Sequence, residues 1–132
     1  AWLEARDGGD AGQPADVRDQ LLFLAAPFDA APVAGPTFGY RVNDVVWGDA
    51  TRALVSESWF RTRRTRTWLI DPSRPDAAPT LLFDRSSEDR YADPGRPVLQ
   101  PGPFGRAVLQ VASDGALFLR GAGASPEGDR PF

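Results

Sequence analysis

The stretch Val45–Asp71, "VVWGDATRALVSESWFRTRRTRTWLID", decides the fold of this chain. Its apolar runs are rich in valine, leucine and tryptophan, and they are divided by a Gly-Asp pair and by an arginine-rich segment, which are typical of turns. Runs joined by so few residues pair most simply as antiparallel hairpins. We therefore expect a β-meander in the middle of the chain.

The same pattern continues on both sides of this stretch. Short β-rich runs recur between turn signals such as "DGGD" (residues 7–10) and "SDG" (residues 113–115), and helical periodicity is nearly absent. The chain is therefore predicted to be all-β and antiparallel, with a sandwich, a barrel and propeller blades left open. The expected strands are residues 1–5, 19–27, 43–48, 51–60, 65–71, 79–84, 106–113 and 116–121.

An internal echo favours propeller blades. "VVWGDATRALV" (residues 45–55) and "LQVASDGALFL" (residues 109–119) share an apolar run, a small residue, an aspartate near the turn and a second apolar run. Asp49 and Asp114 are equivalent positions on this interpretation. Their spacing exceeds the roughly 40 to 50 residues of common propeller repeats, and an inserted loop between the copies would explain the excess.

The composition limits the partners and the chemistry. All 15 basic residues are arginine and the net charge is −3, so nucleic acid is not an expected partner. Cysteine and histidine are both absent, which removes thiolate chemistry, the commonest general base and the commonest metal ligand. No apolar run reaches the length of a membrane span. We predict no cofactor, no metal site and no membrane segment.

Two motifs resemble sites without completing them. "GASPEG" (residues 123–128) imitates the G-x-S-x-G nucleophile elbow, but Glu127 replaces the second glycine and Pro126 has no N–H for an oxyanion hole. Acidic residues cluster in "RSSEDRYAD" (residues 85–93) without the spacing of a calcium loop. We interpret the first motif as a turn and the second as a solvated, salt-bridged loop, and we predict no catalytic residue.

The arginine-rich segment offers one candidate binding site, formed by Arg61, Arg63, Arg64 and Arg66. Strand alternation places Arg64 and Arg66 on one face with Trp68, and Thr65 and Thr67 on the other. One interpretation is a hairpin tip whose guanidiniums pair with local acids and stack on Trp59 or Trp68. The other is recognition of an acidic group by bidentate contacts to a carboxylate.

Several stretches, in order along the chain, carry a family resemblance: "AWLEARDGGD", "RDQLLFLAAPF", "VVWGDATRALVSESWFRTRRTRTWLIDPS", "DRSSEDRYADPG" and "GAGASPEGDRPF". They resemble the N-terminal β-propeller region of bacterial and plastid glutamyl endopeptidases, members of the prolyl oligopeptidase family of serine peptidases. In that family a propeller covers an α/β-hydrolase domain whose Ser, Asp and His carry out the reaction. Nothing in this chain matches the hydrolase domain, and without histidine it cannot supply the triad.

The resemblance implies a partial propeller of about two blades. Residues 1–38 would be the later strands of one blade, residues 40–86 a full blade, residues 87–105 an inserted loop and residues 106–132 the start of the next blade. An incomplete propeller leaves strand edges and apolar faces uncovered. We therefore expect the isolated segment to self-associate through its open edges.

The implied function is that of a non-catalytic propeller segment in a parent serine peptidase. It would cap the hydrolase domain of the same chain and gate the access of peptide substrates. Because a glutamate-selective peptidase needs positive charge near the substrate carboxylate, the four arginines would attract acidic substrates. The alternative is a free-standing all-β binding or scaffold module without peptidase activity. The compartment stays open between the periplasm, the exterior and the cytoplasm of a bacterium.

Overall fold

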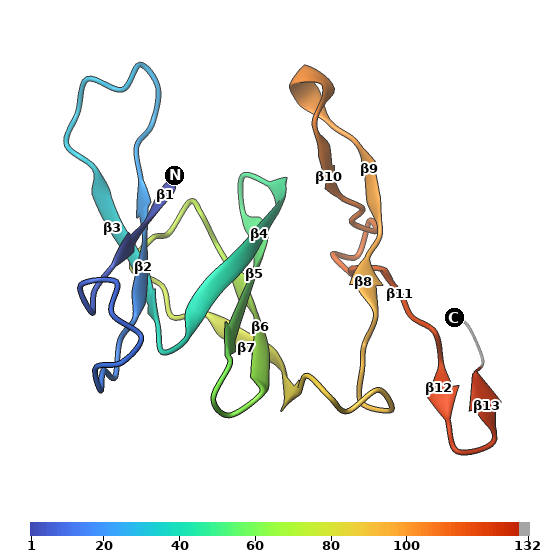
Figure 1. The fold of residues 1–132 in the computed structure, drawn as a ribbon. Coiled ribbons are helices and arrows are strands. Elements are labelled where there is room, and N and C mark those ends of the chain that lie inside the picture. The colour runs from blue at the N-terminus through green and yellow to red at the C-terminus, as the bar shows by residue number, and fades with distance from the viewer. Residues whose placement is uncertain (130–132) are drawn as a thin grey trace.

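Antiparallel β-strands form the regular structure of the chain, which the computed structural model describes for residues 1–129 (Figure 1). Within these residues there is no α-helix, and the one helical turn is far too short to cross a membrane. The all-β, antiparallel prediction is confirmed. The elements are β1 (Trp2–Ala5), β2 (Asp19–Phe23), β3 (Val33–Phe38), β4 (Arg41–Asp49), β5 (Arg52–Trp59), β6 (Arg64–Ile70), β7 (Thr80–Ser86), β8 (Arg96–Pro97), β9 (Leu99–Pro101), the 3-10 turn η1 (Pro103–Gly105), β10 (Ala107–Leu109), β11 (Leu119–Arg120), β12 (Ala124–Ser125) and β13 (Gly128–Asp129).

The central meander is the four-stranded sheet β4-β5-β6-β7, in which each strand pairs with its neighbour along the chain. The pairing of β5 with β6 runs without a bulge from Ala53 opposite Ile70 to Trp59 opposite Arg64. The strands expected at residues 43–48, 51–60, 65–71 and 79–84 are confirmed, with ends that differ by up to two residues.

A three-stranded sheet, β1-β2-β3, precedes the meander. Strand β3 was missing from the expected strands because Pro36 lies within it. Proline cannot donate a ladder hydrogen bond, so it is tolerated where one side of the strand has no partner. β3 is such an edge strand, since it pairs only with β2.

The third unit is built from short pairs, in which β9 pairs with β10 and β8 with β11. Residues 87–105 were expected to be an inserted loop, but they contain β8 and β9, so the segment is not loop throughout. The prolines in β8 and β9 counted against strands in this segment. Their pairing partners, β10 and β11, follow η1 in the chain. The blade boundaries stay predictions, and residues 130–132 of the last expected blade lie outside the described residues.

These units lie as three layers, which Figure 1 shows from left to right as β1–β3, β4–β7 and β8–β11. Leu21 and Phe38 of the first sheet form the buried core with Ala53, Val55 and Ile70 of the second. Because side chains alternate along a strand, the intervening residues of β5 and β6 point to the opposite face, toward the third unit. The second sheet is therefore covered on both faces. This arrangement fits part of a propeller or a sandwich.

The second and third layers meet where β10 lies against β4. Leu109 of β10 is 2% exposed, and a Cβ atom at Gly48 of β4 would lie 3.2 Å from its side chain. Glycine at this position therefore lets the two strands approach.

Asp49 and Asp114 make the same local hydrogen bond in the structure. The Asp49 carboxylate accepts a hydrogen bond from the backbone N–H of Thr51 at 2.9 Å, and the Asp114 carboxylate accepts one from Ala116 at 3.0 Å. Each aspartate therefore closes a turn by accepting from the backbone N–H of the residue two positions later in the chain. The backbone N–H and the side-chain hydroxyl of Thr51 both donate to Asp49, and these two hydrogen bonds are the main reason that the pKa of Asp49 is lowered.

Candidate functional site

The arginine-rich segment is the turn of the β5–β6 hairpin, at the lower edge of the second sheet in Figure 1. Trp59 and Arg64 are the last paired residues, and Arg63 has a positive φ of 54°, which closes the turn. Arg61 is exposed and lies 5.6 Å from the ring centroid of Phe60. Arg63 is also exposed, and it pairs with Glu88 at 3.7 Å. Of the four candidate arginines, these two are the exposed ones.

Arg64 and Arg66 lie on one face of the sheet, as strand alternation predicts. Both contact Asp84 of β7, Arg64 through Nη2 at 2.6 Å and Arg66 through Nε at 3.2 Å. Trp68 belongs to the same face, because its Nε1 donates to Glu57 at 2.8 Å and Arg66 lies 3.8 Å from that carboxylate. The prediction that local acids pair with the guanidiniums is confirmed for these two arginines.

The expected stacking partners were wrong. Arg66 lies over the ring of Tyr40 at 4.3 Å, and the cation over Trp59 is Arg18, at 3.8 Å. Arg18 belongs to the start of the first sheet, so the stack on Trp59 joins two layers.

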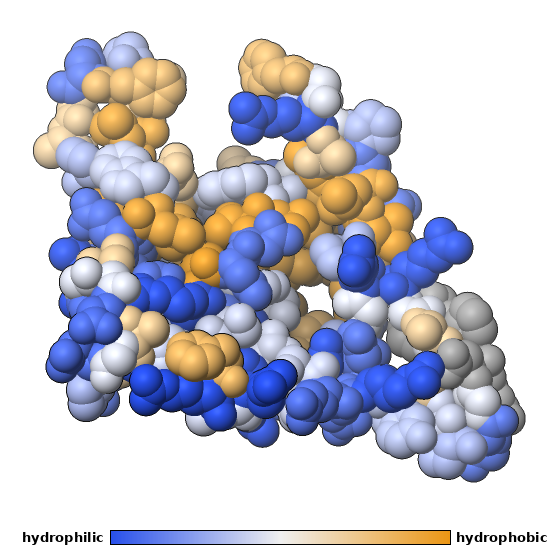
Figure 2. Space-filling view, in the orientation of Figure 1, coloured by the Kyte–Doolittle hydropathy of each residue, from blue (hydrophilic) through white to orange (hydrophobic). Residues whose placement is uncertain are grey.

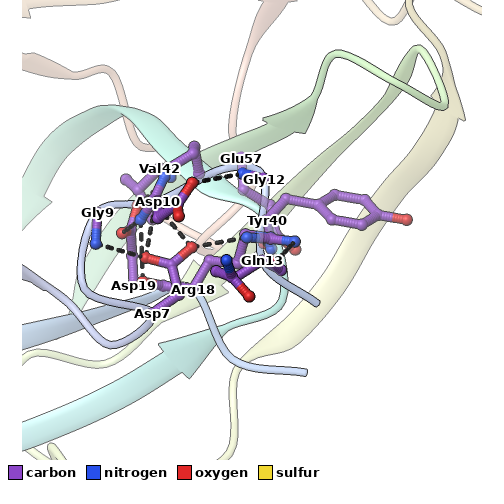
Figure 3. A network of polar contacts seen from close by, with 11 residues as sticks. Asp7, Gly9, Asp10, Gly12, Gln13, Arg18, Asp19, Tyr40, Val42 and Glu57 are labelled. Carbon is purple, nitrogen blue, oxygen red and sulfur yellow. Dashed lines mark hydrogen bonds and ion pairs between the residues drawn. The ribbon is translucent and has the colours of Figure 1, made fainter. Parts of the chain in front are cut away.

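An ion network joins the first two layers, and Figure 3 shows part of it. We call it the inter-sheet ion network, formed by Asp7, Arg18, Asp19 and Arg41. The Asp7 carboxylate accepts hydrogen bonds from Arg41 at 2.6 Å and from Arg18 at 2.7 Å. Arg41 also donates to Asp19 at 2.6 Å. Each cation therefore meets an anion in the contact between the sheets.

The pKa of Asp7 reflects this environment. Removal from water works to raise the pKa, but the hydrogen bonds from Arg41 and Arg18 and from the backbone of Gly9 outweigh it. The pKa of Asp7 is therefore lowered from 3.8 to about 2. The carboxylate stays charged at any pH near neutrality, which is the state that the two arginines need.

Two adjoining cavities lie beside the second sheet. The larger is on the face that looks toward the third unit, and the smaller is at the β5–β6 turn, where residues of both faces line it. The larger, here called the interlayer groove, has a volume of about 740 Å³. Its lining combines apolar residues, which include Leu54, Leu69 and Leu119, with the charged residues Asp44, Arg85, Asp93 and Arg96. The smaller, here called the arginine cleft, has a volume of about 330 Å³ and lies at the β5–β6 turn. Its cationic lining residues are Arg63, Arg64 and Arg85.

The structure therefore divides the candidate residues. Arg63 and Arg64 line the arginine cleft, whereas Arg61 and Arg66 do not. Arg85 was absent from the candidates, although it faces Thr65 across β6 and β7. Only the strand register could have revealed it, because Arg85 follows the turn by more than twenty positions in the sequence.

The incomplete motifs form local structure. Ser125 donates its hydroxyl hydrogen to the carbonyl of Gly128 at 2.7 Å within the β12–β13 turn, in agreement with the turn interpretation of "GASPEG". In "RSSEDRYAD", Arg85 pairs with Asp93 at 3.2 Å, in agreement with a salt-bridged loop. Among residues 1–129 no group of three or more acidic side chains is arranged to hold a metal ion.

Comparison with known proteins finds relatives whose similarity extends along the whole chain. The chain is 40% identical to "Probable glutamyl endopeptidase, chloroplastic" of Oryza sativa subsp. japonica over 141 aligned residues, and 41% identical to the protein of the same name in Arabidopsis thaliana over 142. Each alignment covers 99% of this chain but only 15% and 14% of the respective relative. No family model and no solved structure matches.

Proposed function

We propose that this chain is a non-catalytic β-propeller segment of a serine peptidase of the glutamyl endopeptidase type, within the prolyl oligopeptidase family. The similarity along the whole chain to two proteins with that name carries the proposal. The three stacked antiparallel layers support it, because propeller blades are antiparallel sheets that pack face to face. The bacterial origin expected from the resemblance stays a prediction, since both relatives are plant proteins.

In the parent protein the segment caps a catalytic domain and limits which substrates reach it. A rigid cap of packed sheets admits extended peptides and excludes folded proteins, so its role is selection by size rather than chemistry. The packing of Leu109 on Gly48 is part of this rigidity, because it fixes the third layer on the second. Of the four candidate arginines, Arg61 and Arg63 are the best placed to attract acidic substrates, since these two are exposed.

The first test is the coding sequence around this segment in its genome. The proposal requires a downstream G-x-S-x-G elbow followed by an aspartate and then a histidine. A reading frame that ends soon after residue 132, without such a domain, would refute it. That result would leave a free-standing binding or scaffold module.

The gating role needs a separate test in the intact enzyme. Leu109→Ala removes buried side-chain atoms between the second and third layers, and it should loosen the cap. We expect faster cleavage of a folded, glutamate-containing protein and an unchanged kcat/KM for a short glutamyl peptide. Equal changes for both substrates would refute gating by this segment.

The attraction of acidic substrates is tested by single substitutions of Arg61, Arg63, Arg64 and Arg66 by glutamine. Each loss should reduce kcat/KM for a glutamate substrate relative to the matched glutamine substrate. Arg74→Gln is the control, since Arg74 is exposed on another loop and pairs with Asp71. An unchanged Glu-to-Gln ratio in all four variants would remove these residues from substrate selection.

A further inference from the structure

The stack of three layers ends in two sheet faces, and each of them carries an exposed aromatic residue. Leu21 of β2 points inward to the buried core, so strand alternation and the pairing of Trp2 with Leu22 turn both of these residues outward. Leu119 of β11 lines the interlayer groove, so its neighbour Phe118 also points outward. Trp2 is 38% exposed and Phe118 is 44% exposed. We call the face with Trp2 and Leu22 the head face and the face with Phe118 the tail face.

The two faces carry opposite charges at matching positions. Glu4 lies two residues after Trp2 in β1, and Arg120 lies two residues after Phe118 at the end of β11. Residues two apart in a strand share a face, so the glutamate belongs to the head face and the arginine to the tail face. Glu4 is half-exposed and contacts Arg6 at 3.6 Å, a separation that leaves its carboxylate able to accept from a second cation. Each face therefore combines an aromatic residue with one charge, negative on the head face and positive on the tail face.

The matching residues also lie in the same order along the stack. In Figure 1, β1 descends from the N-terminus and β11 descends toward the β12–β13 hairpin, so the aromatic residue lies above the charged residue on both faces. Figure 2 shows a similar division on the visible side, with hydrophobic residues across the middle and upper part and hydrophilic residues along the lower edge. A second copy stacked in the same orientation would bring Phe118 to Trp2 and Arg120 to Glu4.

Such a contact would continue the packing that already exists within the chain. The first layer packs on the second face to face, through Leu21 and Val55, and the second layer meets the third where β10 lies against β4. Strand edges are less suited to pairing. β3 contains Pro36, and the edge strands β4 and β7 carry charged residues such as Asp44 and Arg85, which discourage the addition of a further strand.

We propose that this chain associates with a second copy of itself head to tail, with the tail face of one copy on the head face of the other. The contact uses sheet faces, whereas the sequence led us to expect association through strand edges. Two copies contribute six layers, and propellers close with about four to eight blades, so a pair can close by making the contact twice. The association needs no catalytic domain, and so it holds or fails independently of the proposed function.

The first measurement is sedimentation velocity of the 132-residue chain over a wide range of concentrations. We expect a monomer that associates into a dimer as the concentration rises. Trp2→Arg places a cation on the head face, opposite Arg120, and Phe118→Glu places a carboxylate on the tail face, opposite Glu4. Each variant should raise the dissociation constant about tenfold or more, because an aromatic anchor is replaced by a like charge.

Mixing the two variants tests the head-to-tail arrangement directly. The Trp2→Arg chain keeps an intact tail face, and the Phe118→Glu chain keeps an intact head face. An equimolar mixture should therefore form a one-to-one dimer at concentrations where each variant alone stays monomeric. A chain with both substitutions should pair with neither variant. Pairing of two like faces, or of two strand edges, would not give this recovery.

Phe104→Glu is the matched control, because Phe104 is 99% exposed at η1 and lies on neither face. It should associate like the parent chain. Circular dichroism checks that each variant is folded, and Glu4→Arg is a second head-face variant, since the Glu4 side chain is 45% exposed. Mixing Glu4→Arg with Arg120→Glu should restore the dimer.

Three results would overturn the proposal. The first is a parent chain that stays monomeric at every concentration. The second is an equal loss of association in Phe104→Glu and Phe118→Glu, which would assign the association to exposed phenylalanine in general. The third is a mixture of Trp2→Arg and Phe118→Glu that stays monomeric although both variants are folded.

Discussion

Replacing Glu57 with glutamine should destabilise the second sheet, although the two side chains have nearly the same size and shape. Glu57 is fully buried, and its two carboxylate oxygens accept from different donors. Oε2 accepts from the backbone N–H of Tyr40 at 2.7 Å, and Oε1 accepts from Nε1 of Trp68 at 2.8 Å. Glutamine has one oxygen, so one of these donors would face its NH₂ group instead.

The size of the effect follows from the contacts. A buried donor without an acceptor costs about 1–3 kcal/mol, and Arg66, 3.8 Å away, would also lose its charged partner on that side. We expect Glu57→Gln to lower the free energy of unfolding by about 2–3 kcal/mol. For a slope of about 2 kcal/mol per molar urea, the unfolding midpoint would fall by about 1 M or slightly more.

The assay is urea unfolding of the 132-residue chain, monitored by circular dichroism and by fluorescence. Glu88→Gln is the control, because the Glu88 side chain is 70% exposed and its contact with Arg63 is 3.7 Å long. The control should change stability by less than about 0.5 kcal/mol.

Repeating the substitution in a Trp68→Phe variant makes the test specific to the hydrogen bonds. Trp68→Phe keeps an aromatic ring but removes the Nε1 donor, so Glu57→Gln should cost about 1–2 kcal/mol less there than in the parent sequence. A cost equal to that of Glu88→Gln, or the same cost in both backgrounds, would refute the assignment of Glu57 as a buried acceptor of two donors.

Three further outcomes are expected. The pKa of Asp7 in the folded chain, about 2, lies below its ordinary value of 3.8, so its contribution to stability is complete above about pH 5 and is lost as the pH falls through about 2. Urea midpoints measured against pH should show this loss, and Asp7→Asn should flatten it. Gly48→Val should lower stability by about 1–3 kcal/mol in thermal unfolding, because its side chain would meet Leu109, and the double variant with Leu109→Ala should lose less than the sum of the two single variants. Asp84→Asn should cost less than about 1 kcal/mol in urea unfolding, since its partners Arg64 and Arg66 are partly solvated, and 1 M salt should remove most of the difference.

The meander could be predicted because its signals are local. Turn residues and alternating β-rich runs lie next to each other in Val45–Asp71, and the pairing needs no partner from elsewhere in the chain. The same alternation placed Arg64 and Arg66 together on one face. Sequence patterns of this kind determine which side of a strand a residue occupies.

Three strands were not predicted from the sequence, because each of them contains a proline. β3 contains Pro36, and β8 and β9 each end in a proline, which counts against a central strand but not against an edge or a short pair. Whether a strand is an edge depends on the whole sheet. The sequence of the segment does not contain that information.

The candidate site was found only in part, because its remaining residues meet through tertiary structure. Arg85 reaches the cleft through its register with Thr65, and Arg18 reaches Trp59 from another sheet. Charge alone gave no reason to choose Arg18 over the hairpin arginines as the cation that stacks on Trp59. Contacts between distant segments therefore account for both the wrong stacking partners and the missing arginine.

The inter-sheet ion network also has a consequence for the order of folding. Each strand of the β4–β7 meander pairs with its neighbour in the chain, so these hairpins close short loops and can form early. Asp7 and Arg41 are 34 positions apart, and their pairing requires both sheets to be in place. Interactions that form after the rate-limiting step affect the unfolding rate and leave the folding rate nearly unchanged. We therefore expect the network to slow the separation of the docked sheets without speeding their assembly.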